Sequence, residues 1–218
     1  MKRLIAAIAV VFVLFGCEIS DNTESEYDFD DFGITEDTSD VEKEVVREMN
    51  AARTNPSQYA ELYIEPRIQK FSGNIYDGRL RTSEGATAVR ECVAAMKSAR
   101  AVKAVRVQRG LNLAAKQHAL SQGETSQTGH TGVDGSSPFE RIEKYGTYTS
   151  AGENIAYGSR TGREIVVQLL IDDGVQDRGH RENIMSADFD SAGVGYSDKH
   201  GQYGSVCVID YAGGYKEK

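Results

Sequence analysis

The chain has 218 residues, with 33 acidic against 25 basic side chains and a formal net charge of −8. The acidic excess lies in residues 18–40, which hold ten carboxylates and no Lys or Arg, so residues 41–218 are balanced in charge. A balanced body has no long-range field to attract nucleic acid, and the acidic segment repels it. With 39% hydrophobic residues, the composition predicts one globular domain and excludes a multidomain or polytopic membrane protein.

Residues 1–16 have the pattern of an export signal. Lys2 and Arg3 precede an apolar run, residues 4–15, that is too short to span a bilayer, because a membrane helix needs about 20 residues. The run ends in Leu14-Phe15-Gly16-Cys17, which resembles the lipobox of bacterial lipoproteins. This resemblance implies cleavage before Cys17 and acylation of that residue, which would give a stable anchor. An ordinary signal peptide with a cysteine at this point by chance is the alternative.

Residues 17–38 are predicted to form an acidic, disordered tether that begins at the lipidated Cys17. Repulsion between like charges keeps such a segment extended and holds the folded domain away from the membrane. The expected location is the bacterial cell envelope, lipid-anchored on its extracytoplasmic side, at the outer membrane or the cell surface. The membrane is therefore an expected partner, nucleic acid is not, and a protein partner is not identified.

The folded part begins with helical patterns. Ser39-Asp40-Val41-Glu42 has the form of a capping box, and apolar residues then recur at helical spacing as far as Met49. Pro56 is predicted to start a second helical stretch. Helical periodicity returns in three further segments, residues 84–99, 111–120 and 163–172. Between them, residues 123–150 are rich in Gly, Ser and Thr and are predicted to form a long, functional loop region.

The end of the chain has the pattern of strands. Residues 192–196 and 203–211 are predicted strands, and the turn signal of residues 198–201 joins them into a hairpin. Helices followed by strands indicate an α+β fold in which helices pack on a small antiparallel sheet. Cys92 and Cys207 form a possible disulfide between a helix and the last strand, worth about 4 to 5 kcal/mol for so long a loop. Two buried free thiols are the alternative.

Two of the four histidines have unusual neighbours. His118 lies in a helical pattern and is expected at the edge of the core, and His200 lies in the hairpin turn and is expected to be solvated. In contrast, His130 lies in Gly129-His130-Thr131-Gly132, where glycines let the backbone aim the imidazole. His180 lies in Gly179-His180-Arg181-Glu182-Asn183-Ile184, and an acid stands two residues before an apolar residue in Gly152-Glu153-Asn154-Ile155.

These motifs resemble those of the CAP superfamily, also called SCP-like, which includes cysteine-rich secretory proteins, antigen 5 and plant pathogenesis-related proteins. The resemblance covers about residues 41–213 and includes further motifs in the same order: Asn50-Ala51-Ala52-Arg53-Thr54-Asn55-Pro56, Leu111-Asn112-Leu113-Ala114-Ala115 and Gly193-Val194-Gly195. Residues 171–175 before Arg178 resemble a bacterial branch of the superfamily. The resemblance implies that residues 39–218 form a single domain, a three-layer α-β-α sandwich around the central sheet.

The resemblance also implies a cleft that holds two histidines and two acids. Matched by motif, these are His130, Glu153 and His180, with the fourth position falling on Asp173. Many members have a glutamate there, one methylene longer, so Asp172 and Glu182 are alternatives for the fourth acid. His130 and His180 are the expected ligands of a weakly bound divalent metal such as zinc, because neutral imidazole nitrogen suits zinc and nearby carboxylates orient the rings.

Three functions fit this sequence. The first is a membrane-anchored module that binds a small, and by resemblance apolar, ligand or lipid, together with or instead of the metal. The second is a metal-assisted hydrolase with Glu153 as its base, although no H-E-x-x-H motif supports a zincin and no nucleophile signature is present. The third is a host-facing or matrix-facing interaction protein with a vestigial cleft. Binding is expected ahead of catalysis, but one fold hosts many functions.

Overall fold

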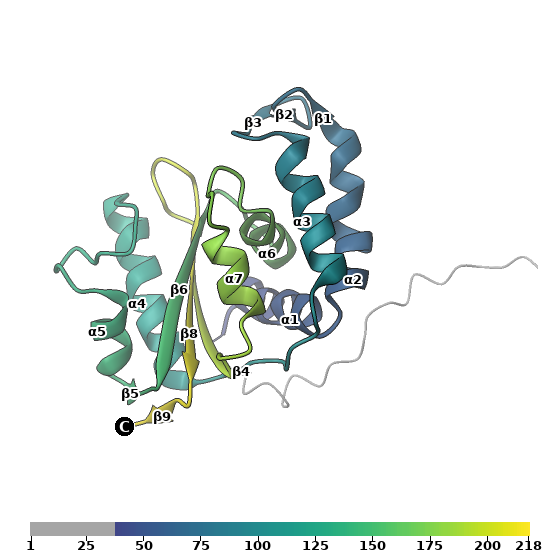
Figure 1. Cartoon of the computed structure of the whole chain (residues 1–218). Coiled ribbons are helices and arrows are strands. Elements are labelled where there is room, and N and C mark those ends of the chain that lie inside the picture. The colour runs from purple at the N-terminus through teal and green to yellow at the C-terminus, as the bar shows by residue number, and fades with distance from the viewer. Residues whose placement is uncertain (1–37) are drawn as a thin grey trace, which may run out of the picture.

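The computed structural model describes residues 38–218 (Figure 1). The predicted signal peptide, Cys17 and all of the predicted tether except Thr38 lie outside the described residues. No helix within residues 38–218 is both long enough and apolar enough to cross a membrane.

A four-stranded sheet forms the centre of the molecule, in the order β4-β7-β8-β6. The strands are β4 (Arg106–Val107), β6 (Ser150–Tyr157), β7 (Ser191–Ser197) and β8 (Val206–Gly213). β8 pairs antiparallel with both β6 and β7, whereas the short β4 pairs parallel with β7. The predicted hairpin is thus confirmed as β7 and β8. Every residue of β8 is buried, because helices cover both faces of the sheet.

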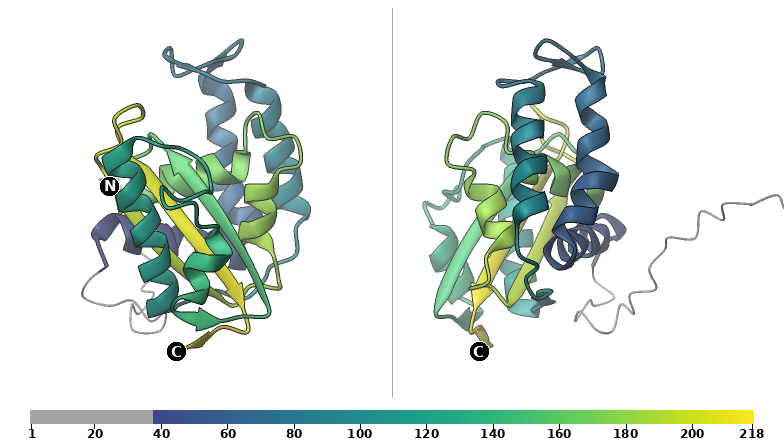
Figure 2. Two further views of the ribbon diagram at one scale, coloured as in Figure 1. Left: turned by 90° about the vertical axis from the view of Figure 1, so that its left-hand side faces the viewer. Right: turned by 45° about the vertical axis from the view of Figure 1, so that its right-hand side comes forward.

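Helices on the two faces complete three layers, and the predicted α-β-α sandwich is confirmed (Figures 1 and 2). One face carries α4 (Arg109–Thr125) and α5 (Pro138–Glu143). The other carries α1 (Asp40–Thr54), α6 (Gly162–Ile171) and α7 (Gly179–Met185), with α2 (Pro56–Tyr59) and α3 (Ala86–Ser98) farther out. The largest hydrophobic cluster lies between this second layer and the sheet.

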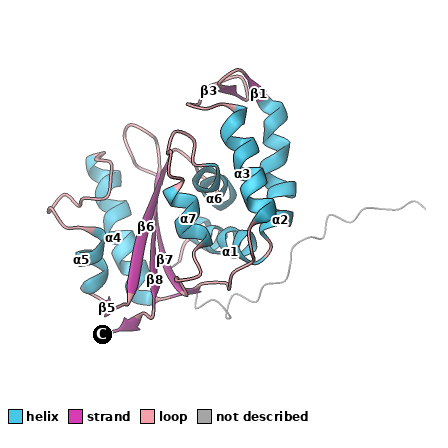
Figure 3. Ribbon diagram, in the orientation of Figure 1, coloured by secondary structure: helices cyan, strands magenta, loops and turns pink. Residues whose placement is uncertain are grey.

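The segment after α2 leaves regular α-helical geometry. A π-helical turn, η2 (Ala60–Ile64), is followed by a 3-10 helix, η3 (Glu65–Lys70), which contains Pro66. Proline has no N–H to donate to an α-helix, so a change of geometry here is expected. A small three-stranded sheet follows, β1 (Phe71–Ser72), β2 (Ile75–Tyr76) and β3 (Leu80–Arg81), and it projects beyond the helices (Figure 3). β5 (Gly146–Thr147) and β9 (Lys216–Glu217) pair at the opposite end.

The first helix is held at both ends by side chains that the sequence motifs supply. Ser39 and Glu42 form the predicted capping box. At the other end Arg53 is fully buried and donates to four carbonyl oxygens, those of Lys103, Ile184, Ser186 and Phe189. One guanidinium thereby joins α1 to the end of α7 and to the segment before β7.

Three local expectations are corrected by the structure. Cys92 and Cys207 are buried free thiols, so the possible disulfide is not formed. Cys92 Sγ instead donates to the carbonyl oxygen of Leu170, and burial raises its pKa to about 12. His200 is 1% exposed, because its ring packs against Tyr157 and Tyr203 beneath the turn.

The third correction concerns the predicted loop of residues 123–150, which contains α5. Ser137 and Glu140 form a second capping box, and Pro138 occupies the first turn of this helix. The capping box and the proline are both signals of a helix start. They lie within a segment whose high Gly, Ser and Thr content indicated a loop instead.

The helix α4 lies directly on β7 because two glycines leave room for it. A Cβ atom on Gly193 would stand 2.1 Å from the backbone carbon of Leu111, and one on Gly195 would stand 2.4 Å from the amide nitrogen of Lys116. The Gly193-Val194-Gly195 motif is therefore a packing motif: its glycines admit a helix backbone, while Val194 fills the core on the opposite face.

We expect Gly193→Ala to lower the free energy of unfolding by about 3 kcal/mol, because the new methyl group must push α4 away from the sheet. Urea denaturation measures this change. Gly179→Ala is the matched control, since its Cβ would meet nothing closer than 3.4 Å and should cost little. Equal stability of the two variants would contradict the packing role of Gly193.

Candidate functional site

The edge strand β6 carries the two central residues of the site on opposite faces of the sheet. Side chains alternate along a strand, so neighbours in sequence point in opposite directions. Glu153 points to the layer of α4 and α5, where it contacts Arg141. Asn154 points to the layer of α7, where its amide donates to the carbonyl oxygen of His180. Two histidine sites are thus organised around one strand.

On the first face, Glu153 is paired with both His130 and Arg141. His130 Nδ1 lies 2.7 Å from Glu153 Oε1, and Arg141 Nη2 donates to Glu153 Oε2 at 2.7 Å. The side chains of Glu153 and Arg141 are each 1% exposed, whereas that of His130 is 52% exposed. A buried guanidinium therefore balances a buried carboxylate, and the carboxylate orients an imidazole that reaches solvent.

The loop that presents His130 is fixed from beneath. Arg141 also donates to the carbonyl oxygens of Ser136 and His130. Gly129, at φ +95°, donates its N–H to the hydroxyl of Tyr157 and accepts from Gln122. This polar scaffold leaves His130 little freedom to move away from Glu153.

On the second face, His180 is paired with Asp172. His180 Nδ1 lies 2.6 Å from Asp172 Oδ1, and the backbone N–H of His180 donates to Asp172 Oδ2 at 3.0 Å. Asp172 ends α6 in the left-handed region, at φ 57°, a conformation that aspartate tolerates better than most residues. This turn directs its carboxylate back toward the start of α7.

The two other acids considered for the fourth position do not contact His180. Asp173, which the motif match favoured, accepts from the backbone N–H groups of Ser83 and Glu84. Glu182 is exposed on α7. Asp172 is therefore the acid that the structure brings to His180, and Asp173 holds two loops together.

That connection between loops is reciprocal. While Asp173 accepts from the segment before α3, Glu84 of that segment accepts from the backbone N–H of Gly174 at 2.8 Å. Arg178 then donates to both oxygens of Glu84, each at 2.7 Å. The hydrogen bonds from Arg178 and Gly174 lower the pKa of Glu84 to about 2. We refer to Glu84, Asp173 and Arg178 as the clasp.

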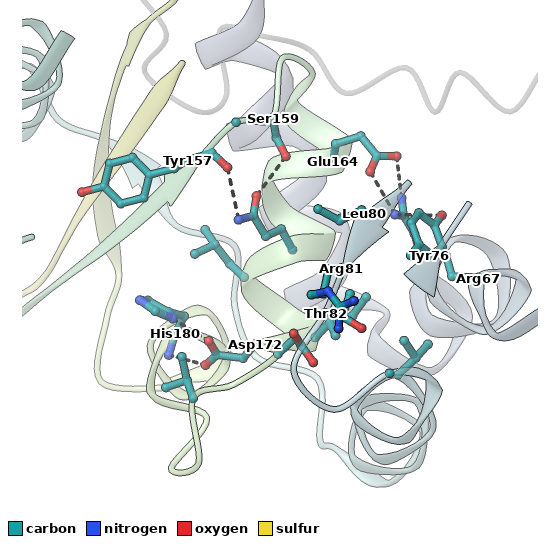
Figure 4. Close-up of a pocket in the computed structure, with 18 of the residues that line it drawn as sticks. Arg67, Tyr76, Leu80, Arg81, Thr82, Tyr157, Ser159, Glu164, Asp172 and His180 are labelled. Atoms are coloured by element: carbon teal, nitrogen blue, oxygen red, sulfur yellow. Dashed lines mark hydrogen bonds and ion pairs between the residues drawn. The ribbon is translucent and has the colours of Figure 1, made fainter. Parts of the chain in front are cut away.

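A cavity of about 580 Å³ lies beside His180 and the clasp (Figure 4). Its walls come from β1 to β3, the end of β6, α6 and the turn before β8. They are formed largely by apolar and aromatic side chains: Phe71, Tyr76, Leu80, Val89, Ile155, Tyr157, Leu169, Ile171, Val175 and Tyr203. Asp172 and His180 form a polar corner at one end (Figure 4). His130 and Glu153 are not among the residues that line it.

The two histidine pairs remain separate. No hydrogen bond or ion pair between described residues joins His130 or Glu153 directly to His180 or Asp172. Within residues 38–218 no group of three or more His, Cys, Asp or Glu side chains is placed to hold a metal ion. Each Nδ1 faces a carboxylate, as in zinc sites, but the donors fall short of the three or four protein ligands that such sites use. The residues present do not fit a closed zinc site.

Comparison with known proteins identifies the family. The sequence model of the cysteine-rich secretory protein family, CAP, matches residues 46–211. Since this is most of the chain, the chain belongs to the CAP family, as its motifs predicted.

Individual relatives are distant. The chain is 28% identical over 113 residues to "Uncharacterized protein YkwD" of Bacillus subtilis strain 168, a match that covers 51% of this chain and 40% of that protein. Among solved structures, an outer surface protein from Borrelia burgdorferi is 22% identical, with a TM-score of 0.44, over 51% of this chain and 79% of that one. An extracellular protein with an SCP domain from Bacillus anthracis strain Ames is 18% identical, with a TM-score of 0.43, over 59% and 38%.

Arg141 is the site residue that the motif analysis missed. It lies on α5, inside the segment predicted as loop. The capping box of Ser137 and Glu140 could have revealed that helix, and an arginine on its inner side is a natural partner for a buried acid. The aromatic wall of the cavity was missed too, because it joins segments that are far apart in the sequence.

The clasp predicts how stability depends on pH. The pKa of Glu84 is lowered in the folded state, so its contribution is fully present above the ordinary value near 4.5 and is lost as pH falls toward about 2. We expect Glu84→Gln to lower the free energy of unfolding at neutral pH by at most about 1 kcal/mol, since the pair is partly exposed. The difference from the wild type should vanish between these two pH values.

Urea denaturation across this pH range measures the effect. Glu182→Gln, a change at an exposed glutamate, is the control and should show no such dependence. A Glu84→Gln deficit that persists unchanged at the acid end would show that the carboxylate charge is not what holds the clasp.

Proposed function

We propose that this CAP-family protein is an extracytoplasmic, membrane-anchored binding protein that holds a small, mainly apolar ligand in the cavity beside His180. The observation that carries the proposal is the cavity itself. At about 580 Å³ it lies within the range of small-molecule sites, which combine apolar walls with a few placed polar groups.

The two walls suit an apolar ligand. Phe71 and Tyr76 pack against each other on the outer hairpin, with ring centroids 5.1 Å apart, and Leu80 beside them is 58% exposed. Across the cavity, Tyr157 and Tyr203 form a second aromatic pair, with centroids 5.2 Å apart. Exposed apolar side chains that gather around one hollow favour a binding surface.

The polar groups around the cavity are mostly paired with one another. Arg67 donates to both carboxylate oxygens of Glu164, so this part of the wall carries no net charge (Figure 4). Asp173 is held by backbone N–H groups. His180, whose Nδ1 is held by Asp172, offers its other ring nitrogen as one directional contact. Arg81 also lines the cavity and adds a positive charge there (Figure 4). These groups favour a mainly apolar ligand with a polar or negatively charged end.

A hydrolase that uses Glu153 as its base is less well supported. That side chain is almost fully buried, and its two oxygens are occupied by His130 and Arg141. Weak binding of a divalent metal by His130 and His180 stays a prediction. We base no function on it, because the donor set is too small for a closed site.

Ligand binding is tested with Nile red, an uncharged apolar dye. We expect Leu80→Asp to weaken dye binding by about tenfold or more, because it replaces an apolar part of the wall with a charge. Fluorescence titration measures the affinity. Leu62→Asp is the matched control, since Leu62 is similarly exposed, at 54%, but does not line the cavity. Equal weakening in both variants, or in neither, would argue against the cavity as the binding site.

The anchor is proposed from Leu14-Phe15-Gly16-Cys17. We expect Cys17→Ser, expressed in a bacterium that processes lipoproteins, to move the protein from the detergent phase to the aqueous phase in a Triton X-114 partition. Cys92→Ala should remain in the detergent phase, because Cys92 is buried in the core and has no part in anchoring. If Cys17→Ser lost residues 1–16 and still stayed in the detergent phase, lipidation at Cys17 would be excluded.

A further inference from the structure

A second acid lies behind the His130 site, on the strand next to β6. Asp210 of β8 is the direct cross-strand partner of Glu153. Side chains of paired residues share one face of a sheet, so both acids point into the layer of α4 and α5. On its other side Asp210 is paired with Gly193, which has no side chain to contribute. Asp210 is fully buried, with 0% of its surface exposed.

The hydrogen bonds around this pair are incomplete if both acids are ionised. Glu153 accepts from His130 and Arg141, one at each oxygen. Neither oxygen of Asp210 accepts a hydrogen bond from any described residue. Two carboxylates have no hydrogen to share between them, and a buried acceptor without a donor is unfavourable. A proton on Asp210 would turn this carboxylate into a donor toward Glu153.

The charges point to the same protonation state. Arg141, 1% exposed, is the cation of the described part that acts on Asp210, and it already pairs with Glu153. The other titratable groups near the pair are Tyr211 and Tyr215 beside Asp210, and His130, His118 and Tyr157 on the side of Glu153. One guanidinium neutralises one carboxylate, so two ionised acids would leave a net buried charge.

We propose that Asp210 is protonated at neutral pH and donates its proton to Glu153 in a hydrogen bond, which makes it a positioning residue for His130. With this bond, Arg141, His130 and Asp210 all direct hydrogen-bond donors at one carboxylate. Glu153 then holds the Nδ1–H of His130, and Nε2 of that ring is left for solvent or a ligand. Burial and the neighbouring Glu153 charge both raise the pKa of Asp210 well above its ordinary range, in support.

This inference is independent of the proposed ligand cavity. Asp210 and Glu153 lie on the α4 and α5 side of the sheet and neither lines the cavity. Loss of dye binding and loss of the shared proton are therefore separate outcomes.

The proton is observed directly by carbon NMR of the full chain with its aspartate carboxyl groups labelled with ¹³C. We expect one aspartate signal to keep the chemical shift of a neutral carboxyl group at neutral pH, and to be missing from Asp210→Asn. If all aspartate signals are those of carboxylates, the proposal is wrong. If the neutral signal appears only with labelled glutamate, the proton lies on Glu153 and the assignment to Asp210 is overturned.

A second measurement uses the pH dependence of unfolding. Since the folded-state pKa of Asp210 is raised, the unfolded state releases this proton at a lower pH than the folded state, and the wild type loses stability as pH rises above about 4. Asp210→Asn does not titrate. The ratio of the unfolding constants, wild type over variant, should therefore rise by up to tenfold per pH unit until the folded-state pKa is reached. Asp198→Asn, at an exposed turn, is the control. A flat ratio for Asp210→Asn would contradict the proposal.

The positioning role needs its own signature, the ¹⁵N-bound Nδ1 proton of His130. In Asp210→Asn the amide can still donate to Glu153, so the signal should remain as in the wild type. In Asp210→Leu that donor is missing, and the signal should exchange faster with water. An unchanged signal in a folded Asp210→Leu variant would rule out positioning of His130. Whether Asp210 carries a proton is decided separately, by the carbon spectrum of the wild type.

Discussion

The alternation of side chains along β6 is the constraint on which the site depends. One residue, Glu153, goes to the layer of α4 and α5, and the next, Asn154, goes to the layer of α7. Because β6 is an edge strand, both layers can deliver a loop to its open side. A shift of register by one residue would turn Glu153 toward the layer of α7 and Asn154 toward the layer of α4 and α5, where neither would meet its present partners. The long antiparallel pairing with β8 fixes that register and brings Asp210 opposite Glu153.

Buried guanidinium groups turn this strand geometry into a fixed site. Arg53 and Arg141 are almost fully buried, and they donate to carbonyl oxygens at the end of α7 and in segments that lack regular structure. A buried charge without partners is costly, so each arginine strongly favours the loop arrangement that provides these acceptors. The loop of His130 and the end of α7 are consequently held by hydrogen bonds to the core. The clasp also holds two loops together, through the ion pair of Glu84 and Arg178. It stabilises the fold less than the buried arginines do, because water competes for these groups at the surface.

The sequence predicted what depends on local pattern. The capping box at Ser39, the hairpin of β7 and β8 and the layer order follow from periodicity, turn signals and family motifs, and these are confirmed. It did not predict α5. The glycine and serine content around Ser137 indicated a loop, although the capping box there is a signal of a helix start. The motif match favoured Asp173 and kept Asp172 as an alternative, because only the left-handed turn at Asp172 decides which of two adjacent aspartates faces His180. The spacing of residues in a sequence does not determine that backbone dihedral angle.

The cavity and the His130 site each contain an imidazole that is held in the same way. In both, a carboxylate holds Nδ1 of an imidazole, which fixes the ring and leaves Nε2 as the nitrogen that is available to another group. They differ in their surroundings: His180 lies beside apolar walls, whereas His130 is half exposed above a buried network of charges. An apolar ligand gains free energy only where water is displaced from apolar surface, which favours the His180 side.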